Sequence, residues 1–345
     1  MITRKESDVL VVGGGSWGSA LATVLAANGK KTLLWVRRKG QAEEINSKHQ
    51  NSVYLPDLEL HPNIEATTDI ETAVKGSPII IVAVPSKHFR SIAAKIGDHI
   101  EGDQVLVHAA KGIELKTYKR MSQVLREETC ALKIGALSGP NLAVEVMQGH
   151  PAGAVIASCY DEVIRKMQAL FTGSRLRLYS GHDIIGTEIG GTFKNIIAIA
   201  AGAIGGMGLG DNTKSLLMTR GVGEMSRFGV ALGADVFTFG GLAGIGDLTA
   251  TCASTLSRNY RVGKALAEGE KTNDIVKGMK YVAEGVYASQ AIYDQAEEVG
   301  LDVSYDLPIV KAVYNVVHKN ISTNEALKEL LTLPTGDELS SLRYL

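Results

Sequence analysis

The stretch VVGGGSWGSALA, residues 11–22, matches two motifs that belong to different chemistries. Gly13, Gly15 and Gly18 fit the G-x-G-x-x-G turn that holds the pyrophosphate of a dinucleotide. Gly14, Ser16 and Gly18 fit the G-x-S-x-G turn that presents a nucleophilic serine in a hydrolase. Both turns connect a strand to a helix, so the neighbouring residues alone do not separate the two interpretations.

The position of the turn in the chain favours the dinucleotide interpretation. A nucleophile turn follows several earlier strands, whereas this turn follows the first predicted strand. A dinucleotide turn needs a strand before it, a helix after it and a second strand ending about 20 residues on, and the sequence predicts all three. Gly13 would make the tight turn, Gly15 would let the backbone approach the pyrophosphate, and Gly18 would allow close helix packing. The N-terminus of the helix would bind phosphate through its free N–H groups and its dipole.

The composition excludes several classes of protein. A chain of 345 residues predicts about two domains. Its 36 Lys and Arg against 37 Asp and Glu form no sustained basic stripe, so no nucleic-acid partner is expected. The three cysteines form no C-x-x-C pair, which argues against a disulfide framework or a structural zinc, and we expect no metal. The N-terminal residues lack a signal-peptide pattern, which predicts a cytoplasmic protein.

Hydrophobic patterning predicts an α/β domain over residues 1–183. Nearly continuous apolar runs are typical of strands buried on both faces of a parallel sheet, and helical patterns lie between them at 17–28 and 86–96. We therefore expect a Rossmann-type, doubly wound, mostly parallel sheet. The expected strands are 8–13, 31–36, 78–84, 104–110, 133–138 and 153–158.

After residue 183 the strand-like runs nearly vanish. Helical patterns predict an all-helical C-terminal domain over 184–333, followed by a surface tail, 334–345. The most apolar stretch, 196–210, is shorter than the roughly 20 residues of a membrane helix, so we expect a buried core helix and no membrane insertion. The expected helices are 188–203, 212–227, 289–299 and 307–319.

The residues after the second predicted strand bear on cofactor choice. An NAD-specific site places Asp or Glu there, against the ribose 2′-hydroxyl. This chain has Arg37, Arg38 and Lys39, and guanidinium groups bind phosphate with charge-assisted hydrogen bonds. The sequence therefore predicts NADP(H) as the preferred cofactor and NAD(H) as an alternative. An ordinary solvated basic turn would have the same sequence.

The segment GGTFKNIIAIAAG, residues 190–202, places Lys194 and Asn195 in an apolar helix. Burial of a lysine lowers its pKa toward the range in which it can transfer protons. Alternatively, Lys194 extends to solvent at the helix end. If residues 244–254 are helical, Asp247 and Thr251 share one face and could contact Lys194.

Two further segments carry residues suited to a ligand. Ser257, Arg258 and Asn259 group a cation with hydrogen-bonding side chains, a set suited to phosphate. Lys111 follows a predicted strand, at the edge of the sheet where ligands of doubly wound folds bind.

In combination these segments resemble the NAD(P)-dependent glycerol-3-phosphate dehydrogenases of bacterial type. The resemblance extends from about residue 8 to about residue 330 and implies reversible reduction of dihydroxyacetone phosphate to sn-glycerol 3-phosphate, the backbone for phospholipid synthesis. It also implies a phosphorylated small-molecule substrate and a homodimer. The motifs are GGGSWGSALA (13–22), AAKGIE (109–114), LSGPNLAVEV (137–146), GGTFKNIIAIAAG (190–202), GLGDNTKSLLMTRG (208–221), GLAGIGDLTATC (241–252), SRN (257–259) and AEGVYAS (283–289).

The resemblance implies a role for each matching residue. Lys194 would be the catalytic acid and base, Lys111 would aid carbonyl polarisation, and Asp247 and Thr251 would lie beside Lys194. Relatives usually have Ser or Thr at the position of Asn141, so the resemblance does not define the exact contact that Asn141 makes. The implied substrate-binding residues are Lys111, Gly139, Asn141, Lys194, Asn195, Asp247, Ser257, Arg258 and Asn259. The implied cofactor-binding residues are Gly13, Gly15, Ser16, Trp17, Gly18, Arg37, Arg38, Lys111, Ala143, Arg258, Val282 and Glu284.

Two alternatives stay open from the sequence. A related dehydrogenase could act on another small 2-oxo or 3-oxo acid, in which case Arg258 would not be needed for a substrate phosphate. A nucleotide-binding sensor without catalysis would use Lys194 only as a structural residue.

Overall fold

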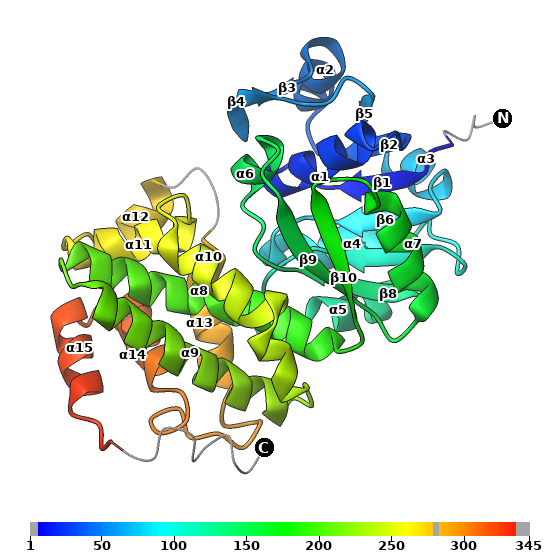
Figure 1. The fold of residues 1–345 in the computed structure, drawn as a ribbon. Helices are drawn as coiled ribbons and strands as arrows, with labels where there is room; N and C mark the ends of the chain where they lie inside the picture. The colour runs from blue at the N-terminus through cyan, green and yellow to red at the C-terminus, as the bar shows by residue number, and fades with distance from the viewer. Residues whose placement is uncertain (1–5, 279–282, 336–345) are drawn as a thin grey trace. The chain divides into compact units, whose positions relative to one another are not determined.

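A computed structural model describes residues 6–278 and 283–335. The chain divides into two compact units (Figure 1). The first, the nucleotide unit, contains the described residues up to Ala110 together with Met121–Ile184. The second, the helical unit, contains Lys111–Arg120 and the described residues from Ile185 onward. Sequence patterns did not predict that residues 111–120 group with the helical unit.

The nucleotide unit is built on a mostly parallel sheet. In the described residues its order is β10-β9-β8-β7-β6-β1-β2-β5, and every neighbouring pair is parallel except β8 and β9. From β5 to β8 this is the strand order of dinucleotide-binding folds. The point at which the strand order reverses direction lies between β1 and β6. The predicted doubly wound fold is confirmed. The strands are β1 (Val9–Val12), β2 (Thr32–Trp35), β5 (Ile64–Thr67), β6 (Ile79–Val82), β7 (Val105–His108), β8 (Ile134–Ser138), β9 (Ala152–Ala157) and β10 (Leu176–Gly181).

The central strands are buried on both faces, which explains their continuous hydrophobicity. Val9 and Val11 of β1 pack in one apolar cluster, while Leu10 and Val12 pack in another on the opposite face. Helices α1 (Ser16–Ala27) and α7 (Asp161–Phe171) contribute to the first cluster. Helices α3 (Ile70–Lys75), α4 (Ser86–Gly97) and α5 (Met121–Glu128) contribute to the second.

All six expected strands are present, but the sheet has two more, β5 and β10. A small antiparallel pair, β3 (Gln50–Asn51) and β4 (Leu55–Glu59), was also not predicted. It follows α2 (Lys39–Lys48), and a short helix, α6 (Ala143–Met147), follows β8.

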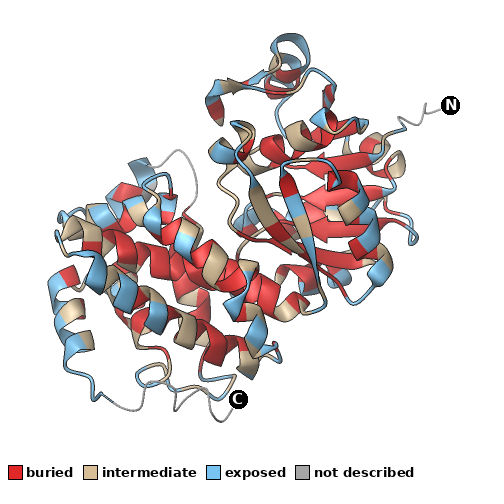
Figure 2. Cartoon of the chain, viewed as in Figure 1, coloured by how far each residue is buried: buried red, intermediate tan, exposed pale blue. Residues whose placement is uncertain are grey.

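The helical unit is organised around α8 (Ile184–Gly206). This helix is long and apolar enough to cross a membrane, but 78% of its most apolar window is buried inside the protein (Figure 2). The apolar stretch 196–210 understates the length of this helix, because α8 begins well before its most apolar run and ends at Gly206. The expected buried core helix is confirmed.

The helical unit contains further helices. The helix predicted over 289–299 lies earlier in the chain than expected. It is α13, which begins at Glu284, and residues 296–300 form turns. The remaining helices are α9 (Asp211–Ala231), α10 (Asp247–Ala253), α11 (Arg258–Ala267), α12 (Thr272–Gly278), α13 (Glu284–Gln295), α14 (Pro308–Lys319) and α15 (Thr323–Leu331). Of the predicted tail, residues 336–345 lie outside the described residues.

Candidate functional site

The glycine-rich turn between β1 and α1 has the shape that fits a pyrophosphate. Gly13 has φ +120°, and a Cβ there would lie 2.6 Å from the Ala83 carbonyl oxygen. A Cβ at Gly18 would overlap the Gly13 carbonyl oxygen, so the first turn of α1 can pack closely only with glycine. A Cβ at Gly15 would meet open space, which leaves room for a phosphate to approach the backbone.

The N-terminus of α1 is suited to an anion. Gly15 caps the helix without a side-chain hydrogen bond, and the first turn contains no acidic residue. The positive end of the helix dipole is therefore not neutralised by a carboxylate of that turn. Trp17, half-buried, lies in this turn, and Ala143 begins α6, which contacts α1.

Tyr54 connects two of the residues expected to bind cofactor. The Ser16 hydroxyl donates to the Tyr54 carbonyl oxygen at 3.0 Å. The guanidinium carbon of Arg38 lies 5.9 Å from the centre of the Tyr54 ring, a cation–π contact. Arg37 and Arg38 are both exposed beyond the end of β2. Sequence reasoning missed Tyr54 because it lies 38 residues from Ser16, in the turn between β3 and β4.

Buried amide side chains also hold the same turn through hydrogen bonds. The Gly14 carbonyl oxygen accepts from Gln41 Nε2 at 2.6 Å and from Asn51 Nδ2 at 3.0 Å. Asn51 Nδ2 also donates to the Ser19 hydroxyl at 2.9 Å. Asn51 and Ser19 are fully buried. The amides of Gln41 and Asn51 therefore fix the turn between β1 and α1, and no local motif indicated them.

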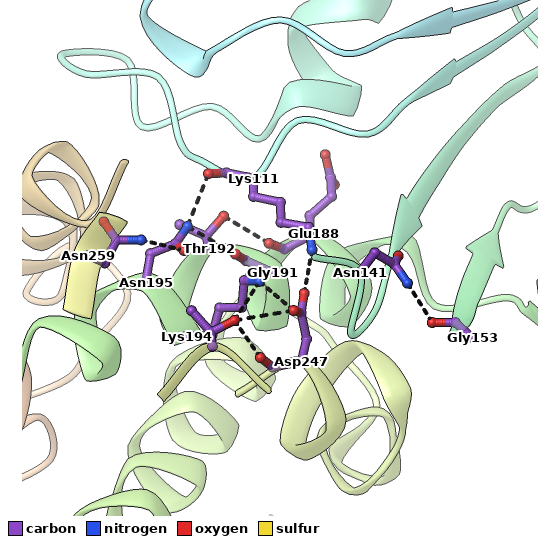
Figure 3. A network of polar contacts seen from close by, with 11 residues as sticks. Lys111, Asn141, Gly153, Glu188, Gly191, Thr192, Lys194, Asn195, Asp247 and Asn259 are labelled. Atoms are coloured by element: carbon purple, nitrogen blue, oxygen red, sulfur yellow. Dashed lines mark hydrogen bonds and ion pairs between the residues drawn. The ribbon is translucent and has the colours of Figure 1, made fainter. Parts of the chain in front are cut away.

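In the helical unit, one carboxylate joins two lysines (Figure 3). Asp247 begins α10, and its Oδ1 accepts a hydrogen bond from Lys194 Nζ of α8. Its Oδ2 accepts from Lys111 Nζ at 2.5 Å. Thr251 Oγ1 accepts from Lys194 Nζ at 2.9 Å and donates to the Asp247 carbonyl oxygen at 2.6 Å. The side chains of Asp247 and Lys194 are 1% and 8% exposed, so the alternative in which Lys194 extends to solvent is wrong.

The surroundings of Lys194 make its proton labile near neutral pH. Burial lowers the pKa of Lys194 to about 7, because the charged amine loses its hydration. The negative charge of Asp247 opposes this change, and the positive charge of Lys111 adds to it. A lysine with such a pKa can both donate and accept a proton.

A chain of amides extends from this cluster toward two helix N-termini. Asn195 Nδ2 lies 3.4 Å from the Lys111 carbonyl oxygen, and its Oδ1 accepts from Asn259 Nδ2 at 2.8 Å. Asn259 Oδ1 in turn accepts from the Gly285 amide at 3.0 Å, next to Glu284 at the start of α13. The helical unit thus brings Lys111, Lys194, Asn195, Asp247, Thr251 and Asn259 into one network.

The residues expected to hold a substrate phosphate lie at the start of α11. Ser257 is its N-cap and accepts from the Tyr260 amide at 3.3 Å. Arg258 is the first helical residue and is exposed, whereas Asn259 is buried. An exposed guanidinium at a helix N-terminus is suited to an anion.

The other expected ligand residues lie in the nucleotide unit or outside the described residues. Gly139 follows β8 with φ +150°, and a Cβ there would lie 2.7 Å from the Gly153 carbonyl oxygen. Asn141 Nδ2 donates to that same oxygen at 2.8 Å (Figure 3). Val282 lies outside the described residues. Among the described residues no group of three or more His, Cys, Asp or Glu side chains could hold a metal ion.

Comparisons with known proteins identify the family of the chain. Two family models, described as the N-terminus and the C-terminus of NAD-dependent glycerol-3-phosphate dehydrogenase, match residues 8–164 and 183–328. A glycerol-3-phosphate dehydrogenase [NAD(P)+] of Staphylococcus saprophyticus is 46% identical over 330 residues, which are 94% of this chain and 98% of the relative. The chain belongs to the NAD-dependent glycerol-3-phosphate dehydrogenase family. As a member of this family it is an oxidoreductase, and the hydrolase interpretation of Ser16 is wrong.

Solved structures of family members have the same fold. The crystal structure of glycerol-3-phosphate dehydrogenase from Coxiella burnetii is similar with a TM-score of 0.89 and 31% identity, covering 95% of this chain and 99% of that one. The enzyme of Saccharomyces cerevisiae is similar with a TM-score of 0.80 and 27% identity, covering 94% and 99%. A ketopantoate reductase from Ralstonia eutropha, at 14% identity and a TM-score of 0.58, shares the fold alone.

Proposed function

We propose that the protein interconverts dihydroxyacetone phosphate and sn-glycerol 3-phosphate in the cytoplasm, supplying the backbone of glycerophospholipids. The observation that carries this proposal is the cluster of buried Lys194 and Asp247 with half-buried Lys111, in a chain of the glycerol-3-phosphate dehydrogenase family. In this cluster Lys194, whose pKa is lowered, shares the Asp247 carboxylate with the second positive charge of Lys111. Reduction of a carbonyl needs both a proton and stabilisation of negative charge on oxygen.

The chain's own residues account for the proton chemistry. A bound nicotinamide would supply the hydride in one direction and accept it in the other. The Lys194 ammonium would donate a proton to the carbonyl oxygen of dihydroxyacetone phosphate, and neutral Lys194 would take the hydroxyl proton of glycerol 3-phosphate in reverse. Lys111 would stabilise the negative charge that develops on the oxygen. Asp247 and Thr251 would orient the Lys194 amine.

The nucleotide unit offers matching groups for the cofactor. The turn at Gly13, Gly15 and Gly18 fits a pyrophosphate, and the N-terminus of α1 would bind it. The exposed guanidinium groups of Arg37 and Arg38 would bind a 2′-phosphate, which favours NADP(H) over NAD(H). Ser257, Arg258 and Asn259 would bind the substrate phosphate. The family resemblance supports a homodimer.

The decisive experiment is a steady-state assay of the purified protein with NADPH and dihydroxyacetone phosphate. We expect NADPH oxidation that depends on the ketone, and little reaction with dihydroxyacetone, which lacks the phosphate. Arg258→Ala should raise KM for the phosphorylated ketone. Absence of turnover by folded protein would overturn the proposal, and an unchanged rate in Arg258→Ala would favour a substrate without phosphate.

The role of Lys194 has its own test. Lys194→Met should lower kcat by about 10² to 10⁴-fold, the usual cost of losing a general acid. NADPH binding, followed by fluorescence titration, should persist because Lys194 is not part of the pyrophosphate turn. Lys264→Met, which removes an exposed lysine of α11, is the matched control and should retain wild-type turnover. Retained activity in Lys194→Met would exclude Lys194 from catalysis and would fit a structural role.

A further inference from the structure

Residues 111–120 form a closed loop of the helical unit, which we call the clip. It lies between β7 and α5 in sequence, although both of these elements belong to the nucleotide unit. Its two ends meet in an antiparallel bridge between Ile113 and Arg120. The Glu114 amide donates to the Lys119 carbonyl oxygen at 2.9 Å and closes the loop further. The backbone of Arg120 is therefore paired with Ile113, which lies two residues after Lys111 in the chain.

The clip is attached to the rest of the helical unit through an apolar contact and at both of its ends. Ile113, 2% exposed, packs in the apolar core formed by α8 and its neighbours. At one end Lys111 pairs with Asp247 of α10. At the other end Arg120 pairs with Glu188 of α8, and these two side chains are 15% and 3% exposed. Glu188 precedes Lys194 on the same helix, so α8 carries both the anchor of the clip and the proposed proton donor (Figure 3).

We propose that Arg120 is a positioning residue whose ion pair with Glu188 holds the clip on α8 and so holds Lys111 Nζ against Asp247. The inference rests on the proposed function, since the place of Lys111 matters only for that reaction. Arg120 itself touches neither substrate nor cofactor in this scheme.

Two physical arguments support a positioning role over a purely stabilising one. A buried ion pair gains little net stability over apolar side chains of similar size, because both charges lose their hydration. Its advantage is a defined geometry, and an arginine gives more of it than a lysine because the guanidinium is a rigid, planar donor. Lys111 needs such help, because its own chain is flexible and the Asn195 amide reaches its carbonyl oxygen only at 3.4 Å.

Release of the clip would also change the charge that Lys194 faces. The described groups that face its amine are Asp247, Thr251 and Cys252 on α10 and Lys111 in the clip. The positive charge of Lys111 lowers the pKa of Lys194, and the carboxylate of Asp247 raises it. If Lys111 moves away, the first influence is lost and Asp247 pairs with Lys194 alone. Both changes move the pKa of Lys194 upward.

The test compares Arg120→Met with Lys133→Met, which removes an ion pair with Glu162 at 3.0 Å in the nucleotide unit. We expect Arg120→Met to lower kcat about tenfold or more, since loss of one electrostatic group at a reacting oxygen costs about 10² to 10³-fold. KM for NADPH should stay unchanged, and the pH of half-maximal glycerol 3-phosphate oxidation should rise. Arg120→Lys should recover part of kcat, and Lys133→Met should behave as wild type.

A double-mutant cycle with Lys111 separates positioning from general damage. In a Lys111→Met background, Arg120→Met should lower kcat no further, because there is no amine left to position. If the two losses multiply, or if the pH profile of Arg120→Met matches wild type, the inference is overturned. If Arg120→Met fails to fold, the pair Arg120→Met with Glu188→Met removes both charges and gives the same comparison. Wild-type protein without turnover would instead overturn the proposed function.

Discussion

Asp247 influences how many protons the two lysines of the site hold, because its two carboxylate oxygens accept hydrogen bonds from both of them. Two positive charges around one negative charge leave an excess of one, in a place where a bare charge is costly. Loss of one proton relieves this excess. Lys194, buried and with a pKa lowered to about 7, is the group from which that proton can leave.

This arrangement predicts opposite pH dependences for the two directions of the reaction. In the proposed mechanism, reduction of dihydroxyacetone phosphate needs protonated Lys194, so its kcat should fall as pH rises through about 7. In the same mechanism, oxidation of glycerol 3-phosphate needs the neutral amine, so its kcat should rise over the same interval. Steady-state pH profiles in both directions check this. The same sign in both directions would show that Lys194 is not the proton carrier.

Arg38 gives a prediction about the cofactor. Arg38→Ala should raise KM for NADPH at least about tenfold, because a charge-assisted hydrogen bond contributes about 1.5–3 kcal/mol. KM for NADH should change little, since NADH has no 2′-phosphate. Lys48→Ala, which removes an exposed charge at the opposite end of α2 from Arg38, is the control. Equal effects of Arg38→Ala on both cofactors would contradict contact with the 2′-phosphate.

At the scale of elements, sequence patterns predicted the strands that are buried on both faces and missed those at the edges. β1 and β6 are uniformly apolar because helices cover both of their faces. β5 and β10 lie at the two edges of the sheet, and their residues alternate between buried and exposed over a short length. Such strands form because a neighbouring strand offers hydrogen bonds, and that neighbour is not visible in the local sequence.

The candidate site divides in the same way. Asp247 and Thr251 could be paired from sequence because four residues along a helix place side chains on one face. The contact of Lys111 with Asp247 spans 136 residues and depends on how the clip folds. Gln41 and Asn51 are ordinary amides in the sequence, and only the fold brings them under Gly14.

The amides beneath the turn predict an effect on cofactor affinity without a direct contact. Asn51→Leu keeps the size of the side chain but removes the donor to the Gly14 carbonyl oxygen and to Ser19. The buried Ser19 hydroxyl then loses this partner, at a cost of about 1–3 kcal/mol, and the Gly14 carbonyl oxygen keeps only the hydrogen bond from Gln41, so the turn should loosen and the Kd for NADPH should rise about fivefold or more. Isothermal titration calorimetry measures this change.

Asn46→Leu is the matched control for Asn51→Leu. Asn46 exchanges hydrogen bonds with the Ala66 backbone of β5, away from the turn. Both variants should lower the free energy of unfolding, but only Asn51→Leu should weaken NADPH binding. Equal affinities in the two variants would show that Asn51 stabilises the unit without shaping the turn.

In the whole molecule positive and negative charges nearly balance, so we expect individual buried groups to determine how stability changes with pH. With a formal net charge of -1, general repulsion between like charges is small near neutral pH. The helical unit buries Lys194 and Glu224. The carboxylate oxygens of Glu224 accept hydrogen bonds from the Ile309 and Val310 amides at the start of α14. Burial raises the pKa of Glu224 to about 8, against the effect of these amides and of Arg227. The two buried groups therefore titrate away from their ordinary ranges in opposite directions.

These shifts predict a minimum in the stability of the helical unit near pH 7–8. Between about pH 4.5 and about pH 8, unfolded Glu224 is ionised while the folded group keeps its proton, so stability falls as pH rises. Between about pH 7 and about pH 10.5, unfolded Lys194 keeps its proton while the folded amine loses it, so stability rises. Glu224→Gln should remove the fall and Lys194→Met the rise, whereas Glu329→Gln, at an exposed site, should change neither. Urea unfolding followed by hydrogen exchange of helical-unit peptides, from about pH 5 to about pH 9, measures these slopes. Parallel stability curves for wild type and Glu224→Gln would mean that the carboxylate is ionised in the folded protein, held by the α14 amides.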